Sequence, residues 1–123
     1  MKHDRLEAMV KGWFVGDFNP TAVHSSACEV AVKHYQAGDH EALHHHRVAT
    51  ETTLIISGEV EMRGRRWTAG DIITLEPGEA TDFTAITDAI NVVVKLPSVA
   101  GDKYPGSLPA AGLEPARPKG NGF

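Results

Sequence analysis

An all-β barrel or sandwich is the fold class that the sequence predicts, and three observations support it. The chain from Cys28 to Leu96 consists of short runs rich in β-branched residues, separated by glycines and acidic turns. Several of these runs alternate apolar and polar residues, which is the period of a half-buried strand. Ser57-Gly58 and Arg63-Gly64 stand between runs, where glycine permits the positive φ of a tight hairpin turn. Neighbouring strands are therefore expected to be antiparallel.

The N-terminal region, residues 1–27, is expected to form a short helix and then a strand or pad. Asp4 with Glu7 three residues later resembles a helix capping pair, and apolar residues at positions 6, 9 and 10 would give the following turns one apolar side. The aromatic-rich stretch at residues 13–18 is interpreted as an extra strand or a pad that covers the barrel.

The central segment, residues 28–96, is expected to form the barrel, because its strand-like runs leave little room for helix. The candidate strands span Glu29 to Gln36, Ala42 to His46, Glu51 to Ser57, Glu59 to Met62, Arg65 to Thr68, Asp71 to Leu75, Thr81 to Ile86 and Ile90 to Leu96.

The C-terminal segment, residues 97–123, has a different composition. Five of the seven prolines lie there, with repeated glycine and alanine and almost no apolar periodicity. This composition predicts a disordered tail. Ending the chain near Tyr104 is accordingly expected to leave the fold unchanged.

Length and composition indicate one soluble domain. A chain of 123 residues is long enough for one hydrophobic core and too short for two full ones. Its residues are 41% hydrophobic and 23% charged, and no apolar run is long enough to span a bilayer. The N-terminus lacks the apolar stretch and cleavage site of a secretory signal. We therefore expect a cytoplasmic protein that has no membrane partner.

Charge and cysteine content exclude two further classes of function. The formal net charge is −4, and the only clustered cations are Arg63, Arg65 and Arg66 at a turn, where we expect them to be solvated. This distribution argues against nucleic acid as a partner. The single cysteine, Cys28, excludes an internal disulfide and a thiolate-rich metal site, and its expected role is buried packing.

A metal site is indicated by the segment from residue 38 to residue 58. His44 and His46 are two residues apart, so both project from one face of a strand, roughly 6.5–7 Å apart along it. Glu51 follows after a connection long enough to reverse the chain, so its carboxylate is expected to arrive from an antiparallel strand beside the first. His45 points the opposite way, to solvent or to a packing partner, and is excluded from the site. The two imidazoles and the carboxylate can hold one divalent metal ion.

The same segment resembles a known signature. The pattern Gly38-x5-His44-x-His46-x4-Glu51-x6-Gly58 matches the first motif of the cupin superfamily without a gap or substitution. A second motif follows, with a Gly-Asp pair at 70–71 and a Pro-Gly pair at 77–78. The resemblance covers about residues 28–96 and implies a double-stranded β-helix, or jelly-roll barrel, with the metal in its lumen.

The second motif departs from the family pattern at two positions. Glu76 stands where the pattern has its first proline, and Thr81 stands where it has its last metal histidine. Thr81 is a poor ligand for a divalent ion because its hydroxyl is neutral, whereas Asp82 could be a fourth ligand if the strand bulges by one residue. Strand alternation favours a site with three protein ligands. Such a site is compatible with Fe, Mn, Ni or Zn.

Other polar residues near the proposed site are Lys33, Tyr35, His34 and Glu76. On the first barrel strand, Lys33 and Tyr35 share one face, and His34 lies on the other. If the first face looks into the lumen, Lys33 and Tyr35 could bind an anionic or hydroxylated ligand. If it looks outward, they are ordinary surface groups.

Two functions fit these residues. The first is a metal-dependent enzyme of the isomerase, lyase or oxygenase type acting on a small polar molecule, related to carbohydrate or nucleotide-sugar metabolism by resemblance to compact single-domain bacterial cupins. No general base is evident in the sequence. The second is a non-catalytic module that binds or senses a small ligand. A homodimer is expected in either case, because the aromatic stretch and the sheet edges of so small a barrel need cover.

Overall fold

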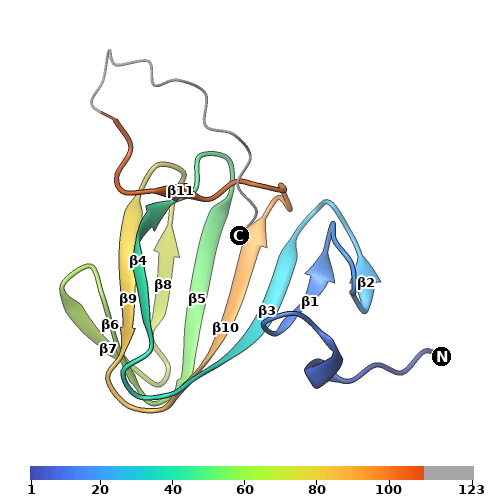
Figure 1. The fold of residues 1–123 in the computed structure, drawn as a ribbon, viewed down its shortest axis with the longest axis horizontal. Helices are drawn as coiled ribbons and strands as arrows, with labels where there is room; N and C mark the ends of the chain where they lie inside the picture. The colour runs from blue at the N-terminus through green and yellow to red at the C-terminus, as the bar shows by residue number, and fades with distance from the viewer. Residues whose placement is uncertain (110–123) are drawn as a thin grey trace.

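Two β-sheets face each other in the computed structural model, which describes residues 1–109 (Figure 1). Within these residues the chain forms one 3-10 turn, η1 (Leu6–Ala8), and eleven strands. The strands are β1 (Trp13–Gly16), β2 (Val23–His24), β3 (Glu29–Tyr35), β4 (His40–His45), β5 (Thr50–Ser57), β6 (Glu59–Met62), β7 (Arg65–Thr68), β8 (Ile72–Leu75), β9 (Ala80–Ala85), β10 (Ala89–Leu96) and β11 (Tyr104–Pro105).

The strand order separates the two layers. One sheet has the order β2-β1-β3-β10-β5-β8, and the other has the order β11-β4-β9-β6-β7. Every pair except β1 with β2 is antiparallel. Consecutive strands β3, β4 and β5 alternate between the sheets, so the chain wraps around the interior. The predicted all-β architecture is confirmed.

All eight strands expected between residues 28 and 96 are present, and their ends differ from the expected ones by no more than two residues. The hairpin expected at Gly58 is wrong, because β5 and β6 belong to different sheets, but the tight turn between them still depends on this glycine, which has a φ of +85°. A Cβ atom at this position would lie 2.1 Å from the carbonyl oxygen of Asp88, so both conformation and space require glycine here.

The expected N-terminal helix is wrong, because only the single turn η1 forms. Arg5 precedes this turn and makes no side-chain capping hydrogen bond. Asp4 forms an ion pair with Lys2 at 3.3 Å in place of a cap. No residue of η1 is buried, so the turn has no apolar side to hold against the barrel.

The aromatic stretch forms strand β1, as one of the two expected alternatives. β1 pairs with β3 and extends the larger sheet by one strand. The ring of Trp13 lies under two ammonium groups, those of Lys33 at 5.3 Å and Lys95 at 4.8 Å from its centroid. The N-terminal segment therefore reaches the interior of the barrel at this ring.

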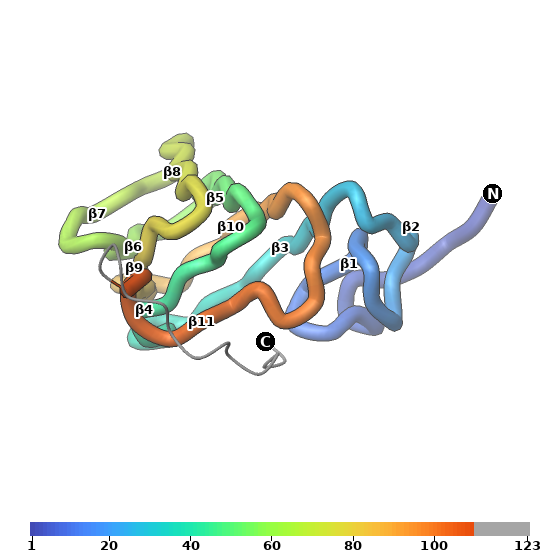
Figure 2. The backbone as a smooth tube through the Cα atoms, turned by 90° about the horizontal axis from the view of Figure 1, so that it is seen from above, coloured from blue at the N-terminus to red at the C-terminus, as the bar shows by residue number. Residues whose placement is uncertain are grey.

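The prediction of a disordered tail from residue 97 is wrong for the part of the tail that the structure describes. Residues 97–109 cross one end of the barrel and add strand β11 to β4, as Figures 1 and 2 show. Ser98 and Asp102 are buried. The hydroxyl of Ser98 donates to Glu29 Oε2 at 2.7 Å and accepts from the backbone N–H of Asp17 at 2.9 Å. Residues 110–123 lie outside the described residues.

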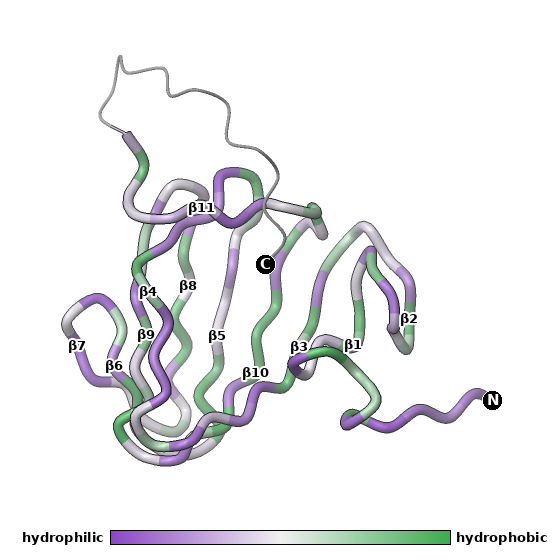
Figure 3. Tube along the Cα trace, in the orientation of Figure 1, coloured by the Kyte–Doolittle hydropathy of each residue, from purple (hydrophilic) through white to green (hydrophobic). Residues whose placement is uncertain are grey.

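Apolar and polar side chains occupy different parts of the interior. Figure 3 shows β10 as a mainly hydrophobic strand and much of β4 as hydrophilic. The apolar core consists of Ile55, Val60, Met62, Ile73, Leu75, Phe83, Ala85 and Ala89. The buried histidines of β4 lie outside this cluster. Within residues 1–109 no helix has the length and apolar character needed to cross a membrane.

Candidate metal and ligand site

A pocket of about 200 Å³ opens in the interior between the two sheets. His44, His46 and Glu51 all line it, so the structure brings the three predicted metal ligands together. Lysine, glutamate, tyrosine, asparagine and threonine side chains line the rest of the pocket, together with the apolar side chains of Trp13, Met62, Phe83 and Val93. Such a lining suits a small polar molecule rather than an apolar one.

His44 and His46 face the pocket with one ring nitrogen each. The Nδ1 atom of His44 lies 2.8 Å from the carbonyl oxygen of Ala42, and Nδ1 of His46 contacts the carbonyl oxygen of Asp102. A carbonyl only accepts, so each Nδ1 carries the proton and donates it. Each Nε2 is then left with a lone pair. Backbone carbonyls fix the tautomer of metal-bound histidines in the same way.

Burial keeps His44 neutral. Its pKa is lowered from the ordinary value of 6.5, because desolvation penalises the charged ring more than the hydrogen bond to Ala42 stabilises it. A neutral ring presents a lone pair rather than a proton to the pocket. The rings of His44 and His46 meet edge to face, with centroids 5.6 Å apart.

Glu51 approaches the histidines from the opposite sheet. The expectation that it would lie on a strand beside β4 is wrong, since β4 pairs with β9 and β11 while β5 pairs with β10 and β8. The connection at residues 46–49 carries the chain across the barrel instead of reversing it within one sheet. Glu51 therefore faces His46 across the lumen, and its Oε2 lies 3.2 Å from His46 Nε2.

This contact places a ring nitrogen of His46 against a carboxylate oxygen of Glu51. His46 Nε2 is buried and forms no hydrogen bond of good geometry with any described residue, although Glu51 Oε2 is close. When the ring of His46 carries a single proton, that proton sits on Nδ1, so the Nε2 lone pair faces a carboxylate. Burial alone would raise the pKa of Glu51, but His46, Lys95 and His44 together hold it below its ordinary value. A cation between Nε2 and the carboxylate would satisfy both groups.

The side chains of His44, His46 and Glu51 are suitable ligands for a divalent metal, although in this structure they do not surround one point. Among the described residues, no three His, Cys, Asp or Glu side chains already surround a common point. The carboxylate of Glu51 contacts the ring of His46 instead. Two imidazole nitrogens and one carboxylate are nonetheless ligands that Fe, Mn, Ni and Zn accept.

The two residues considered as a fourth ligand lie in different places, Thr81 in the pocket lining and Asp82 outside it. Thr81 lies directly opposite His44 in the β4–β9 pair and is buried, but its hydroxyl donates to the carbonyl oxygen of Asp82 at 2.6 Å. Asp82 is absent from the pocket lining, and its Oδ1 accepts from the backbone N–H of Arg63 at 3.3 Å. The register of β9 shows no bulge at these two residues.

A bulge occurs in β4 instead, and it brings in a residue that sequence analysis missed. Glu41 pairs with Phe83 and His44 with Thr81, so three steps along β4 match two along β9. The extra residue shifts the alternation, and Glu41 faces the pocket together with His44. The Tyr35 hydroxyl donates to Glu41 Oε2 at 3.2 Å. Simple parity from His44 would have placed Glu41 outside.

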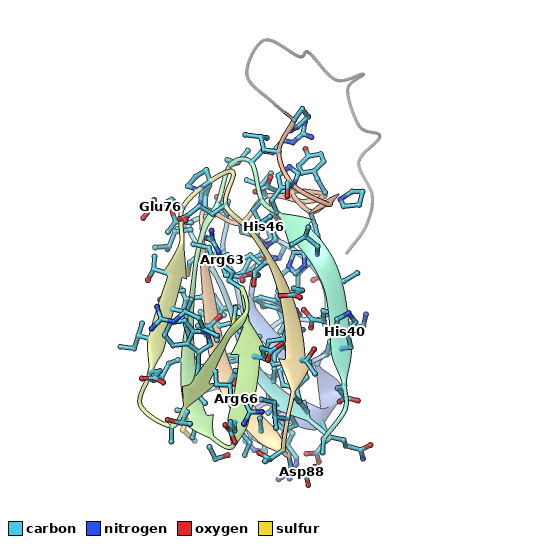
Figure 4. All side chains as sticks on the ribbon, turned by 90° about the vertical axis from the view of Figure 1, so that its left-hand side faces the viewer. His40, His46, Arg63, Arg66, Glu76 and Asp88 are labelled. Atoms are coloured by element: carbon cyan, nitrogen blue, oxygen red, sulfur yellow. The ribbon has the colours of Figure 1, made fainter. Side chains whose placement is uncertain are left out.

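Lys33 and Tyr35 line the pocket, which corresponds to the first of the two alternatives drawn from the sequence. Burial, followed by the negative charge of Glu41, strongly raises the pKa of Tyr35, so its phenol remains protonated. His34 is exposed on the other face of β3, and Glu76 is exposed on a turn. Figure 4 shows Glu76 at the rim of the barrel and His46 within it.

Asp102 is a second residue that sequence analysis missed. Its carboxylate accepts from three consecutive backbone N–H groups in the β4–β5 connection, those of Arg47 at 2.8 Å, Val48 at 3.1 Å and Ala49 at 2.8 Å. Its carbonyl oxygen accepts from His46 Nδ1. One residue of the C-terminal segment thus holds both His46 and the connection that leads to Glu51.

His45 points away from the metal ligands, and it is buried rather than solvent-facing. Its Nδ1–H donates to the carbonyl oxygen of Gly106 at 2.7 Å, while its Nε2 accepts from Arg47 Nε at 3.1 Å. The ring stacks on Tyr104 with centroids 5.5 Å apart. The packing partner of His45 is therefore the C-terminal segment of the same chain.

Comparison with solved structures identifies the fold. A protein of Klebsiella pneumoniae described as uncharacterized, with a double-stranded beta-helix domain, is 28% identical, with a TM-score of 0.62 over 68% of this chain and 74% of its own. KdgF from Halomonas sp. is 18% identical, with a TM-score of 0.56 over 63% and 76%. A sugar phosphate isomerase from the cupin superfamily of Silicibacter pomeroyi is 21% identical, with a TM-score of 0.54 over 59% and 52%. No family model and no curated protein matches the chain. The predicted double-stranded β-helix fold is confirmed.

Proposed function

We propose that this chain, which has the fold of the cupin superfamily, binds one divalent metal ion through His44, His46 and Glu51 and acts on a small polar molecule in the same pocket. The proposal depends chiefly on the contact between His46 Nε2 and the carboxylate of Glu51. The buried nitrogen lies 3.2 Å from the half-buried carboxylate, and it has no hydrogen-bond partner among the described residues.

The surrounding residues support a chemical role for the pocket. A bound divalent ion would polarise a carbonyl or hydroxyl oxygen of the ligand. Glu41 supplies a carboxylate for moving a proton at the ligand, and the hydroxyl of Tyr35 holds Oε2 of that carboxylate at 3.2 Å. Thr81 is small, and its hydroxyl is engaged with the backbone, so it leaves room beside His44 for the ligand.

Sugar phosphates are the first substrates to test, because one solved structure with this fold is a sugar phosphate isomerase. The protein would be loaded separately with Fe(II), Mn(II), Ni(II) and Zn(II), and assayed with sugar phosphates, nucleotide sugars and small diketones. Turnover that disappears in Glu41→Gln supports an enzyme that uses this carboxylate. Saturable binding without turnover would contradict the enzyme and support a ligand-binding or sensing module.

Thr81→His is expected to tighten metal binding about tenfold or more, because it adds an imidazole beside His44. The same change should weaken ligand binding, since the new ring fills the space that Thr81 leaves. Calorimetric titration with Zn(II) measures the first effect. Asp82→Ala is the matched control and should leave the metal affinity unchanged, because Asp82 contacts Arg63 on the outside. A large loss in Asp82→Ala with no gain in Thr81→His would contradict the three-ligand site.

We also infer a homodimer formed by the outer face of the larger sheet. Val32, Val92, Leu54 and Ile72 are paired across β3, β10, β5 and β8, and they form an apolar stripe on that face. Ile72 is 67% exposed on the edge strand β8. A second copy related by a two-fold axis would present the same stripe, and the two stripes would cover each other.

Ile72→Lys is expected to convert the dimer to a monomer in light scattering at micromolar concentration, because it places a charge within the stripe. Val23→Lys, at a similarly exposed position on the opposite edge of the sheet, should leave the dimer intact. A wild-type protein that scatters as a monomer would refute this inference.

A further inference from the structure

The pocket is positively charged although the chain is acidic. Its lining contains two glutamates, Glu41 and Glu51, and no arginine. Its cationic side chains are Lys11, Lys33, Lys95 and Lys103. The formal net charge of the whole chain is −4, so this concentration of lysines is local. Like charges gathered around one small space destabilise the protein unless an anion lies between them.

Lys33 is a half-buried lysine of this pocket. Its ammonium lies 5.3 Å from the Trp13 ring centroid and forms no ion pair with a carboxylate within residues 1–109. Lys95, in contrast, lies 3.5 Å from Glu29 Oε1. Burial lowers the pKa of Lys33, Glu41 opposes this, and the nearby charge of Lys103 lowers it further. An anion in the pocket would stabilise the charged ammonium of Lys33 against both its burial and the nearby charge of Lys103.

Asn91 adds a second, independent observation. It is 1% exposed, and its Oδ1 has no hydrogen-bond partner among the described residues. Asn91 lies on β10 directly opposite Lys33 on β3, and both side chains line the pocket. A buried amide oxygen without a donor is costly, and a ligand hydroxyl would supply that donor.

We propose that the ligand is a small anion that also carries a hydroxyl group, with its charge beside Lys33 and Lys103 and its hydroxyl donating to Asn91 Oδ1. This inference rests on the proposed function, because it names the class of molecule that binds next to the metal ligands. The chemistry is common to hydroxycarboxylates and to sugar phosphates, and the two sources can be separated by titration.

The probes are D-galacturonate, D-galactose 6-phosphate and neutral D-galactose, titrated calorimetrically into the full chain with and without Zn(II). At least one anion is expected to bind about tenfold or more tightly than galactose. Lys33→Met should weaken the binding of that anion about tenfold and leave the binding of galactose unchanged. Lys2→Met removes an exposed lysine outside the pocket and should have no effect. Asn91→Leu should weaken the binding of all three sugars, and thermal melting shows whether this variant folds.

The outcomes separate the two sources and the two proposals. Tighter binding of galacturonate identifies a carboxylate, and tighter binding of the phosphate identifies a phosphoryl group; both support a hydroxylated anion. Equal binding of galactose and the anions, equal effects of Lys33→Met and Lys2→Met, or no saturable binding at millimolar concentration overturns the inference. The zinc content of the same samples tests separately whether the protein binds a metal ion. Anion binding that depends on Lys33 in a protein that takes up no metal contradicts the proposed function alone.

Discussion

Replacing His46 with alanine is expected to remove the divalent ion, so that metal content after dialysis falls from about one per chain to near zero. His46 supplies the nitrogen that lies against Glu51, and only His44 and Glu51 would remain as protein ligands. The loss of affinity should exceed the roughly 10–100-fold that accompanies loss of an outer-shell partner. Elemental analysis of the dialysed proteins measures the result.

His40→Ala provides the matched control for this change. His40 lies on the same strand but is exposed, and its ring contacts the Thr84 hydroxyl at 2.9 Å outside the pocket. Figure 4 shows it away from His46. Its substitution should leave one metal per chain. Equal metal loss in both variants would mean that the pocket is not the binding site.

Asp102→Ala is expected to lower the free energy of unfolding by about 3 kcal/mol or more, because three backbone N–H groups lose a buried charged acceptor and each such bond contributes about 1.5–3 kcal/mol. This corresponds to a decrease of about 10 °C in the melting temperature for a chain of this size. Metal affinity should fall as well, because the released connection joins His46 to Glu51. Thermal melting and zinc titration check the two effects.

Three further proteins show whether the effect belongs to Asp102. Asp102→Asn keeps one acceptor oxygen and should lose less stability than the alanine variant. Asp88→Ala removes an exposed carboxylate that accepts from a single backbone N–H among the described residues, that of Ala37. A chain that ends after Gly101 lacks Asp102 and should be at least as unstable as Asp102→Ala. If Asp102→Ala and Asp88→Ala melt at the same temperature, the assigned role of Asp102 is wrong.

The barrel strands could be predicted because their sequence carries two local signals. On β9, buried Thr81, Phe83 and Ala85 alternate with more exposed neighbours, which is the period of a strand with one face inward. Glycines such as Gly64, in the β6–β7 hairpin, then mark the turns between strands, since few other residues adopt the positive φ required. Both signals depend only on neighbouring residues, so they can be read without the fold.

The remaining features depend on contacts that local patterns do not record. The C-terminal segment is held by Ser98 and Asp102, whose buried groups are polar, so hydrophobic periodicity gives no sign of them. Glu41 enters the pocket only because a bulge in β4 shifts the alternation. The loop before Glu51 could equally have reversed the chain within one sheet. In each case the deciding partner lies far away in the sequence.

Anomalous X-ray diffraction from crystals grown with Mn(II) shows whether His44, His46 and Glu51 hold one metal ion in this pocket. We expect one anomalous peak per chain, within coordination distance of both Nε2 atoms and of the Glu51 carboxylate. A peak elsewhere on the chain, or no peak in crystals whose pocket is clearly ordered, would contradict it.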